Sequence, residues 1–312
     1  MMLTSESLSA KWNSLPTQAG GYTRVDHLHP LELYIGLEAI NQKSLLLISS
    51  FEPSPPPSSK SLQVVVGQRT DGKWALAFRL LRMEQEEVYL QLCCDLIESA
   101  RQQRNDAKGM QFVVDRYRRW HRLMETQENG LMGEAARKGL IGELLFLQRV
   151  LKSGLSALDA VNGWIGPESA DRDFVFPDCW HEIKTAGAGA KSVSVSSLEQ
   201  LDAAPPGELV VFFVDRTAPG DGLGFSLNEK VQEIKAELQG APAALELFAT
   251  KLLDYGYMFQ REYDVPHYRF HGMRRYRIDS SFPRLIKDNV PAQIAAATYA
   301  LSLAAIENWR TE

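Results

Sequence analysis

The stretch DRDFVFPDCWHEIKT, residues Asp171 to Thr185, decides the fold. Its apolar residues alternate with charged ones on both sides of a proline-containing turn, a pattern typical of two paired strands. The pattern predicts strands at 173–176 and 181–184, joined by a four-residue turn at 177–180. With that turn, an antiparallel pair places Asp173 opposite Lys184.

Successive side chains of a strand alternate between the two faces of its sheet, so this hairpin separates charged from apolar residues. One face carries Asp173, Val175, Glu182 and Lys184, and the other carries Phe174, Phe176, His181 and Ile183. We therefore expect a core on the second face and a charged cluster on the first. The alternative is an exposed sheet face with an ordinary ion pair, which contributes well under about 1 kcal/mol.

Three aspartates could complete a site with Glu182. Asp171 lies one pair beyond the predicted strands, and Asp178 lies at the tip of the turn, where its side chain would point to solvent or cap the turn. We expect Asp173 to be the functional acid. The literal Pro-Asp pair at 177–178 is then a decoy.

A further acid comes from GLIGELLFLQRVL, which has helical apolar spacing. Glu143 lies within the apolar stripe of this helix, and a buried carboxylate is costly unless it is paired or close to a metal. Gly139 and Gly142 flank it and would allow another element to approach closely. The alternative is a glutamate paired with Arg137 or Arg149 at the margin of the helix.

Carboxylates beside a lysine provide the groups that metal-dependent phosphodiester hydrolysis requires. Magnesium prefers hard oxygen ligands and keeps several waters. We predict Glu143, Asp173 and Glu182 as ligands of Mg²⁺, for which Mn²⁺ could substitute, with the Ile183 carbonyl as a further ligand. Lys184 would orient the attacking water and stabilise the developing anion.

The order Glu143, Asp173, Glu182 and Lys184 resembles the PD-(D/E)XK nuclease superfamily, in which a helix carrying a glutamate precedes a hairpin with Asp and Glu-x-Lys. The chain is most similar to a bacterial family of unknown function classed with these nucleases, through the segments GLIGELLFL, DRDFVF, HEIKT and VSVSSLEQLD within 131–202. The resemblance implies a DNA substrate and a setting among restriction and phage-defence proteins. It departs from the motif name at the displaced Pro-Asp pair.

The resemblance also extends to Gln200 in SLEQLD, which matches a polar helix position that contacts the active site in some relatives. We include Gln200 among the predicted catalytic residues. The alternative is a surface glutamine in a helix capped by Ser196 or Ser197, at capping-box distance.

The remaining segments predict an α+β or α/β protein with a restriction-endonuclease-like core, a mixed sheet flanked by helices. Residues 22 to about 98 read as strands, with a hairpin at Asp71-Gly72, so 1–100 is predicted as a β-rich domain for recognition or partner docking. Residues 101–312 form the predicted nuclease-like domain. It includes helices at 197–202, 227–238 and 242–255, a continuous apolar strand at 208–214, and a final alanine-rich helix begun by Pro291.

The net charge is −5, so the whole chain lacks the excess of basic residues typical of an independent nucleic-acid-binding domain. Locally, YRFHGMRRYR at 268–277 is basic, and we predict that Arg274, Arg275 and Arg277 contact phosphates. A solvated face is the alternative. The three cysteines show no zinc or disulfide spacing and are expected to be reduced bystanders.

These observations predict a magnesium-dependent DNA endonuclease of a restriction or phage-defence system. The alternatives are a non-catalytic DNA-binding or scaffold subunit acting through a partner, and an RNA nuclease. DNA, other defence proteins and a second copy of the chain are the expected partners. The sequence has no secretion signal and no long apolar run, so we expect a cytoplasmic protein without membrane association.

Overall fold

The computed structural model describes residues 3–312 except 17–20, 40–41, 127–130, 169 and 203–206, and only the backbone of 122–126. The chain divides into two compact units, residues 1–130 and 131–312. The first unit includes helix α3 (Asp106–Thr126), which the sequence analysis placed in the second domain. None of the helices in the described ranges has both the length and the apolar character needed to cross a membrane.

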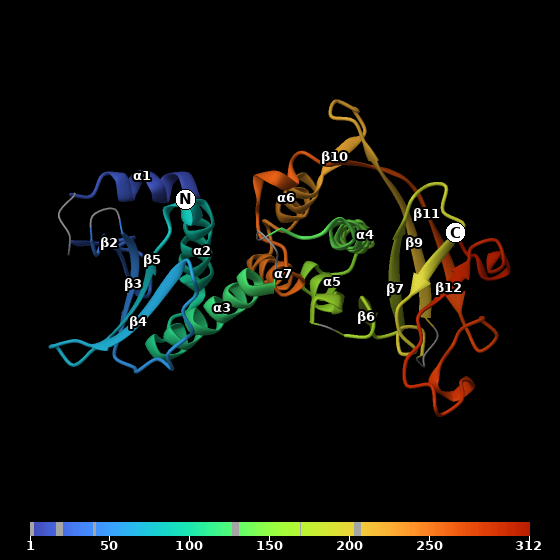
Figure 1. Ribbon diagram of the computed structural model, residues 1–312, viewed down its shortest axis with the longest axis horizontal. Coiled ribbons are helices and arrows are strands. Elements are labelled where there is room, and N and C mark those ends of the chain that lie inside the picture. Colours follow the sequence, from blue (N-terminus) through green and yellow to red (C-terminus); the bar gives the residue numbers. More distant parts are fainter. Residues whose placement is uncertain (1–2, 17–20, 40–41, 127–130, 169, 203–206) are drawn as a thin grey trace. The chain divides into compact units, whose positions relative to one another are not determined.

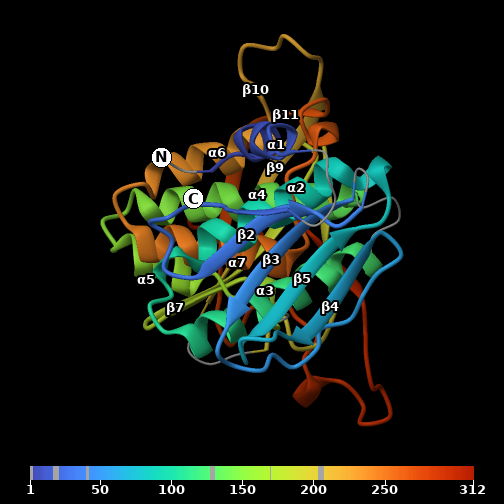
Figure 2. The same cartoon turned by 90° about the vertical axis from the view of Figure 1, so that its left-hand side faces the viewer.

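An antiparallel sheet with the order β1-β2-β3-β5-β4 forms the first unit, as predicted. Figure 2 shows β2, β3, β5 and β4 side by side. The strands are β1 (Tyr22–Arg24), β2 (Glu32–Leu37), β3 (Lys43–Ser49), β4 (Leu62–Gln68) and β5 (Trp74–Leu80). The predicted hairpin joins β4 to β5, and Gly72 supplies the left-handed conformation of its turn, with φ of 80°.

The first unit also contains helices α1 (Ser5–Asn13), α2 (Glu86–Ser99) and α3. The prediction of strands as far as residue 98 is wrong from Glu86 onward, where α2 forms. Its buried residues include Tyr89, Leu92 and Leu96, at the three- and four-residue spacing of one helical face. The Tyr89 hydroxyl also donates a hydrogen bond of 2.8 Å to the Phe78 carbonyl of β5.

The second unit is built on a mixed sheet with the order β10-β11-β9-β7-β6. Its strands are β6 (Phe174–Phe176), β7 (Cys179–Ala186), β9 (Gly207–Thr217), β10 (Gly224–Ser226) and β11 (His267–Ile278). Only the β7 and β9 pair within this sheet is parallel. Helices flank the sheet, as Figure 1 shows, so the predicted mixed-sheet fold class is confirmed.

Two cores cover the opposite faces of this sheet, because β9 alternates its apolar side chains between them. Val210 and Phe212 pack with the helices, whereas Leu209 and Val211 pack with the small sheet of β8 and β12. The elements of these layers are α4 (Glu134–Leu151), α5 (Ala157–Gly163), α6 (Leu227–Glu237), α7 (Pro242–Tyr255), β8 (Ser192–Val195) and β12 (Tyr299–Ser302). The continuous apolar run of β9 is therefore buried on both sides, as predicted.

Two predicted helices are wrong. The alanine-rich segment after Pro291 forms turns and then β12, which pairs with β8 and buries Leu301. This pairing outweighs the helix propensity of alanine. Residues 197–202 form bends and a turn instead of a helix, with Leu198 and Leu201 both anchored in the interior.

The predicted register of the decisive hairpin is also wrong. Phe174 pairs with His181 and Phe176 with Cys179, so the turn contains two residues instead of four. The turn is short because β7 already begins at Cys179. The following residue, Trp180, pairs with Gly207 of β9. A side chain at that glycine would meet the indole at 2.2 Å, so this close strand contact requires glycine.

The error in register is two residues, which preserves the side of the sheet on which each residue lies. Phe174 and His181 therefore share the helix-covered face with Ile183, while Glu182 and Lys184 lie on the other. The corrected pairing extends to place Asp173, rather than Val175, across from Glu182.

Helix α4 approaches β7 closely at Gly142, where a Cβ atom would lie 2.1 Å from Thr185 Oγ1. We expect Gly142→Ala to lower the free energy of unfolding by about 1–3 kcal/mol, because the added methyl group overpacks this contact. Denaturant unfolding measures the change. The double variant Gly142→Ala/Thr185→Ala should recover most of the loss, and a single variant as stable as the wild type contradicts the expected overlap.

Candidate active site

Three elements position the predicted acidic and basic groups. Helix α4 supplies Glu143, the residue directly before β6 is Asp173, and β7 supplies Glu182 and Lys184. Because β6 is the edge strand, an acid that precedes it can be reached from both faces of the sheet. This placement explains how residues from opposite faces contribute to one cluster.

Glu182 and Lys184 form the best-defined pair of the cluster. Lys184 Nζ lies 2.7 Å from Glu182 Oε1, and the Glu182 side chain is only 2% exposed. The second oxygen, Glu182 Oε2, is buried without a hydrogen-bond partner. Oε1 of Glu182 thus has a partner, whereas Oε2 lacks the hydrogen-bond donor or cation that a buried oxygen normally has.

Gln200 lies beside the lysine although its segment is not helical. Its Oε1 accepts a hydrogen bond of 3.3 Å from Lys184 Nζ and one of 2.8 Å from the Ser196 backbone N–H. The structure therefore shows contact of Gln200 with the cluster, whereas the alternative of a glutamine in a capped helix is wrong because residues 197–202 form no helix. It fixes where the ammonium group lies.

Backbone N–H groups bind both the side chain and the main-chain carbonyl of Asp173. Its Oδ2 accepts a hydrogen bond of 2.7 Å from the Ile183 N–H. Its carbonyl accepts hydrogen bonds from the N–H groups of Ile165 and Gly166, at 2.8 and 2.9 Å. These bonds fix the carboxylate at the strand edge, with Oδ1 left for another partner.

Glu143 is buried in α4 and accepts a hydrogen bond of 2.7 Å from Trp164 Nε1 at its Oε2. The Tyr255 hydroxyl, which a Cβ atom on Gly139 of the same helix would meet at 2.9 Å, also interacts with this carboxylate. A Cβ atom placed on Gly166 would lie 2.8 Å from Glu143 Oε2 and 3.0 Å from Asp173 Oδ1. The two acids therefore border the same small space, which a side chain at position 166 would fill.

The alternative partners of Glu143 are otherwise engaged. Arg137 pairs with Glu134, and Arg149 pairs with Glu312. Asp171 and Asp178 are both exposed, and Asp178 lies in the turn between β6 and β7. Neither of these two aspartates lies at the cluster, whereas Asp173 does.

The carboxylates of the cluster hold their protons more tightly than ordinary acids. Burial, followed by the charge of Asp173, raises the pKa of Glu182 to about 8. Burial raises the pKa of Asp173 to about 6, against the opposing effects of the Ile183 N–H and Lys184. For Glu143, burial and then the Asp173 charge raise the pKa well above its usual value. One lysine thus does not compensate two buried acids, Glu143 and Glu182, and a partly buried third, Asp173.

A divalent cation fits this imbalance, because it would stabilise the ionised carboxylates and give the Glu182 oxygen a partner. Within the described ranges, the only three Cys, His, Asp or Glu side chains with all ligand atoms inside 4.8 Å are Cys179, His181 and Glu208. Glu143, Asp173 and Glu182 therefore do not meet that spacing as a group, and an ion held by them would need waters among its ligands.

The predicted phosphate-binding arginines all lie on β11, at the other side of β9 from the cluster. Arg275 pairs with Glu208, and Arg277 Nε lies 3.0 Å from Asp279 Oδ2. Arg274 lies over the Phe213 ring, 5.3 Å from its centroid. Arg275 and Arg277 leave one face of β11 and Arg274 leaves the other, so the three do not form one row. Their contact with phosphates stays a prediction.

Sequence reasoning missed the residues that orient Glu143. Trp164, Gly166 and Tyr255 lie 21, 23 and 112 residues from it along the chain, and no local spacing connects them. Only the packing of α4 against α5 and α7 brings them together. In the sequence, no motif or spacing marks Trp164 or Tyr255 as a residue that contacts Glu143.

Comparison with known proteins gives one match. The model of a family described as "Putative PD-(D/E)XK family member, (DUF4420)" matches residues 8–304. The comparison with curated proteins and the comparison with solved structures gave no match.

Proposed function

Because the chain belongs to this PD-(D/E)XK family, we propose that it is a magnesium-dependent DNA endonuclease of a bacterial restriction or phage-defence system. The observation that carries the proposal is the pairing of Lys184 with a buried Glu182 whose second oxygen has no partner, beside Asp173. Family membership supports nuclease chemistry. DNA as substrate, magnesium as metal and defence as setting are our proposal.

In this proposal, Asp173 and Glu182 would hold the metal, and Glu143 and the Ile183 carbonyl would be its further ligands. The bound ion supplies charge stabilisation at the phosphate and a water of lowered pKa. Lys184 would orient the attacking water and stabilise the charge that develops on the phosphate oxygens as the bond to the leaving oxygen breaks. Gln200 keeps the lysine in place by accepting its hydrogen bond.

The remaining groups maintain the geometry of the acids. The Ile183 N–H fixes Asp173, and the indole of Trp164 fixes Glu143. Since both donors are parts of the packed interior, the carboxylates are oriented before the metal binds. Such support limits the loss of side-chain freedom on binding.

The experiment that tests this function incubates the purified full chain with supercoiled and linear DNA in Mg²⁺, Mn²⁺ or chelator. We expect cleavage with either metal and none with chelator. A parallel incubation with RNA distinguishes the substrate classes. Absence of cleavage under every condition contradicts an enzyme that acts alone.

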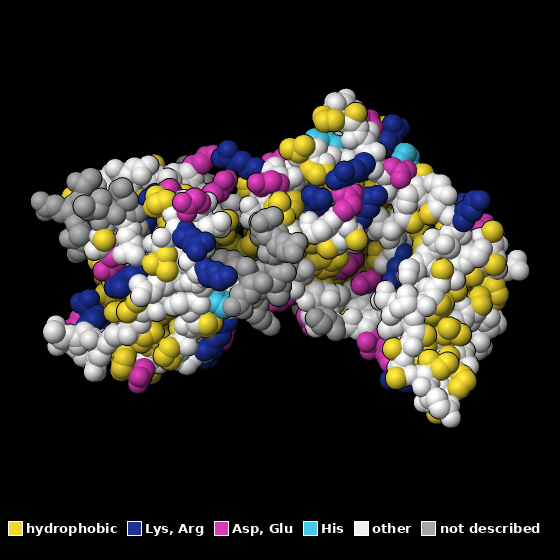
Figure 3. Space-filling model, in the orientation of Figure 1, with side chains coloured by type: hydrophobic (Ala, Val, Ile, Leu, Met, Phe, Trp, Pro, Cys, Tyr) yellow, Lys and Arg dark blue, Asp and Glu magenta, His cyan; other side chains and the backbone are white. Residues whose placement is uncertain are grey.

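A second candidate, a non-catalytic DNA-binding or scaffold subunit, is favoured by the balance of surface charge. The net charge is −5, and Figure 3 shows acidic side chains interspersed among the basic ones on the visible face of the second unit. Phosphate contacts dominate unaided affinity for DNA. A partner that supplies them, a defence protein or a second copy of the chain, would then be required.

We predict that Arg274→Gln and Arg277→Gln each weaken DNA binding and reduce the slope of log affinity against log salt by about 1, because each removes one phosphate contact. Binding measured at several salt concentrations gives the slope. Lys152→Gln, at an exposed lysine of the same unit, is the matched control and should leave it unaltered. An unchanged slope in the arginine variants contradicts their assignment.

A further inference from the structure

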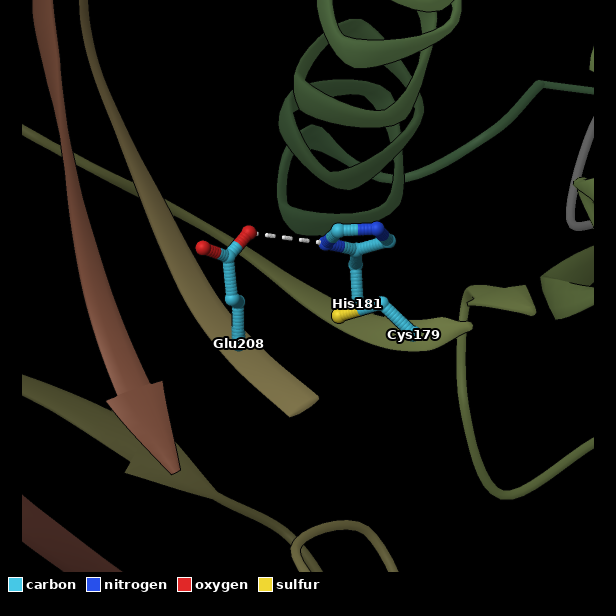
Figure 4. A group of neighbouring side chains, drawn as sticks. All are labelled: Cys179, His181 and Glu208. Carbon is cyan, nitrogen blue, oxygen red and sulfur yellow. Dashed lines mark ion pairs between the residues drawn. The ribbon is translucent and has the colours of Figure 1, made fainter. Parts of the chain in front are cut away.

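Strand β7 presents a second group of potential ligands on the face opposite to Glu182 and Lys184. Cys179 and His181 are two residues apart, so both side chains leave the same face of the strand. Glu208 of β9 is the direct cross-strand partner of His181. In Figure 4 the carboxylate lies to the left of the imidazole and the thiol sulfur lies below the same end of the ring, and the ligand atoms of all three lie within 4.8 Å of one another.

His181 is held in place but lacks a hydrogen bond at Nδ1. The side chain is 8% exposed, and its ring packs against Phe146 and Phe176 with centroid distances of 4.8 and 5.8 Å. Nδ1 lies 3.1 Å from Glu208 Oε2, yet it is buried without a partner in hydrogen-bonding geometry. A buried nitrogen in this condition is costly, unless a further atom binds it.

Glu208 has capacity for a ligand although it pairs with Arg275. The guanidinium donates to Oε2 of the carboxylate through Nε, at 3.0 Å, and through Nη2. The other oxygen, Oε1, receives no hydrogen bond from the described residues. The oxygen that faces His181 is Oε2, so a rotation of the carboxylate would bring Oε1 to an ion while the arginine stays on Oε2. The arginine also limits the net negative charge of the group.

We propose that Cys179, His181 and Glu208 bind a divalent cation of the zinc class. Thiolate, imidazole and carboxylate are together the ligands that this borderline-soft ion accepts, whereas magnesium avoids sulfur. Three protein ligands leave one position of a tetrahedral ion for water. Binding replaces the thiol proton by the metal, so one proton is released to solvent.

This site is independent of the proposed nuclease function. It lies on the other face of β7 and uses a different class of ligand, so each site can be occupied or lost without the other. The sequence predicts Cys179 to be a bystander. Its potential partner Glu208 comes close only because β7 and β9 pair in parallel. No spacing between the three residues could have predicted this.

The test titrates Co²⁺, as a spectroscopic substitute for zinc, into the metal-free full chain under reducing conditions. We expect one equivalent to produce the visible bands of tetrahedral Co²⁺ together with a thiolate-to-cobalt charge-transfer band, and Zn²⁺ to abolish both by displacement. Cys179→Ser should remove the charge-transfer band. His181→Ala should weaken cobalt binding by at least about tenfold.

Two matched controls separate this site from other ligands. Cys94→Ser removes a half-buried thiol of the first unit, and Glu182→Gln removes a predicted magnesium ligand; both should retain the cobalt spectrum. Because His181 is packed in the interior, Glu208→Gln provides a milder variant that preserves the side-chain shape and should also weaken binding. Absence of a thiolate band in the wild type, or its persistence in Cys179→Ser, overturns the proposal.

Discussion

Lys184→Met is expected to lower the rate of DNA cleavage by at least about 100-fold, as removal of a single charge-stabilising donor does in other enzymes. The ammonium group lies 2.7 Å from Glu182 and is the one basic side chain that contacts that acid among the described residues. Methionine keeps much of the length of the side chain but cannot orient a water or stabilise the phosphate. The readout is the initial rate of nicking of supercoiled DNA in magnesium.

The matched control is Lys191→Met, at an exposed lysine just before β8. It should cleave like the wild type, which excludes a general effect of losing one positive charge. Circular dichroism and thermal unfolding of Lys184→Met establish that the variant is folded, since the change leaves Glu182 without its cation. Wild-type cleavage by a folded Lys184→Met protein contradicts the assigned role.

The second large effect concerns stability and its dependence on pH. In the metal-free chain we expect the melting temperature to fall as the pH rises from about 4 to about 8, the interval between the ordinary carboxyl pKa and the raised values. The pKa of Asp173 rises to about 6 and that of Glu182 to about 8 on folding. The folded state thus binds more protons than the unfolded state throughout this interval, so deprotonation favours unfolding.

A divalent metal should reverse this loss, because it stabilises the ionised carboxylates. The increase in melting temperature on adding Mg²⁺ is expected to be small at pH 5 and to reach roughly 3 °C or more at pH 8, equivalent to about 1 kcal/mol. Calorimetry with magnesium or chelator across this pH range measures both quantities. Glu182→Gln, which cannot ionise, should flatten the metal-free curve.

Two results would contradict the proposal that uncompensated acidic charge destabilises the metal-free chain. If the metal-free protein is equally stable at pH 5 and pH 8, the buried acids do not carry the uncompensated charge that their burial implies. If Glu182→Gln retains the full slope, other groups produce it. Neither result depends on DNA, so this test is independent of the cleavage assay.

The sequence predicted the faces of the decisive hairpin because alternation depends only on parity. The predicted partner of Asp173 was wrong by two residues, yet Glu182 and Lys184 still lie on the same face. The turn length depends on Trp180 and its contact with Gly207, a residue beyond the hairpin. Local patterns thus identified which side chains cluster, whereas tertiary pairing decided how they align.

The failures elsewhere have the same cause. The segment after Pro291 has helix-forming alanines, but β8 offers it a strand partner and a place for Leu301. Helix α2 was missed because its apolar residues followed directly after the strands. Trp164 and Tyr255 reach Glu143 from α5 and α7, so their contribution depends on the packing of three helices.

The most direct test of the central claim compares the wild-type chain with Asp173→Asn in magnesium-dependent cleavage of supercoiled DNA. The variant keeps the shape of the side chain and an oxygen for the Ile183 N–H, but loses the charge that would hold the metal. We predict nicking by the wild type, none with chelator, and a loss of at least about 100-fold in the variant. Cleavage that persists in Asp173→Asn at the wild-type rate would contradict an active site built on this acid.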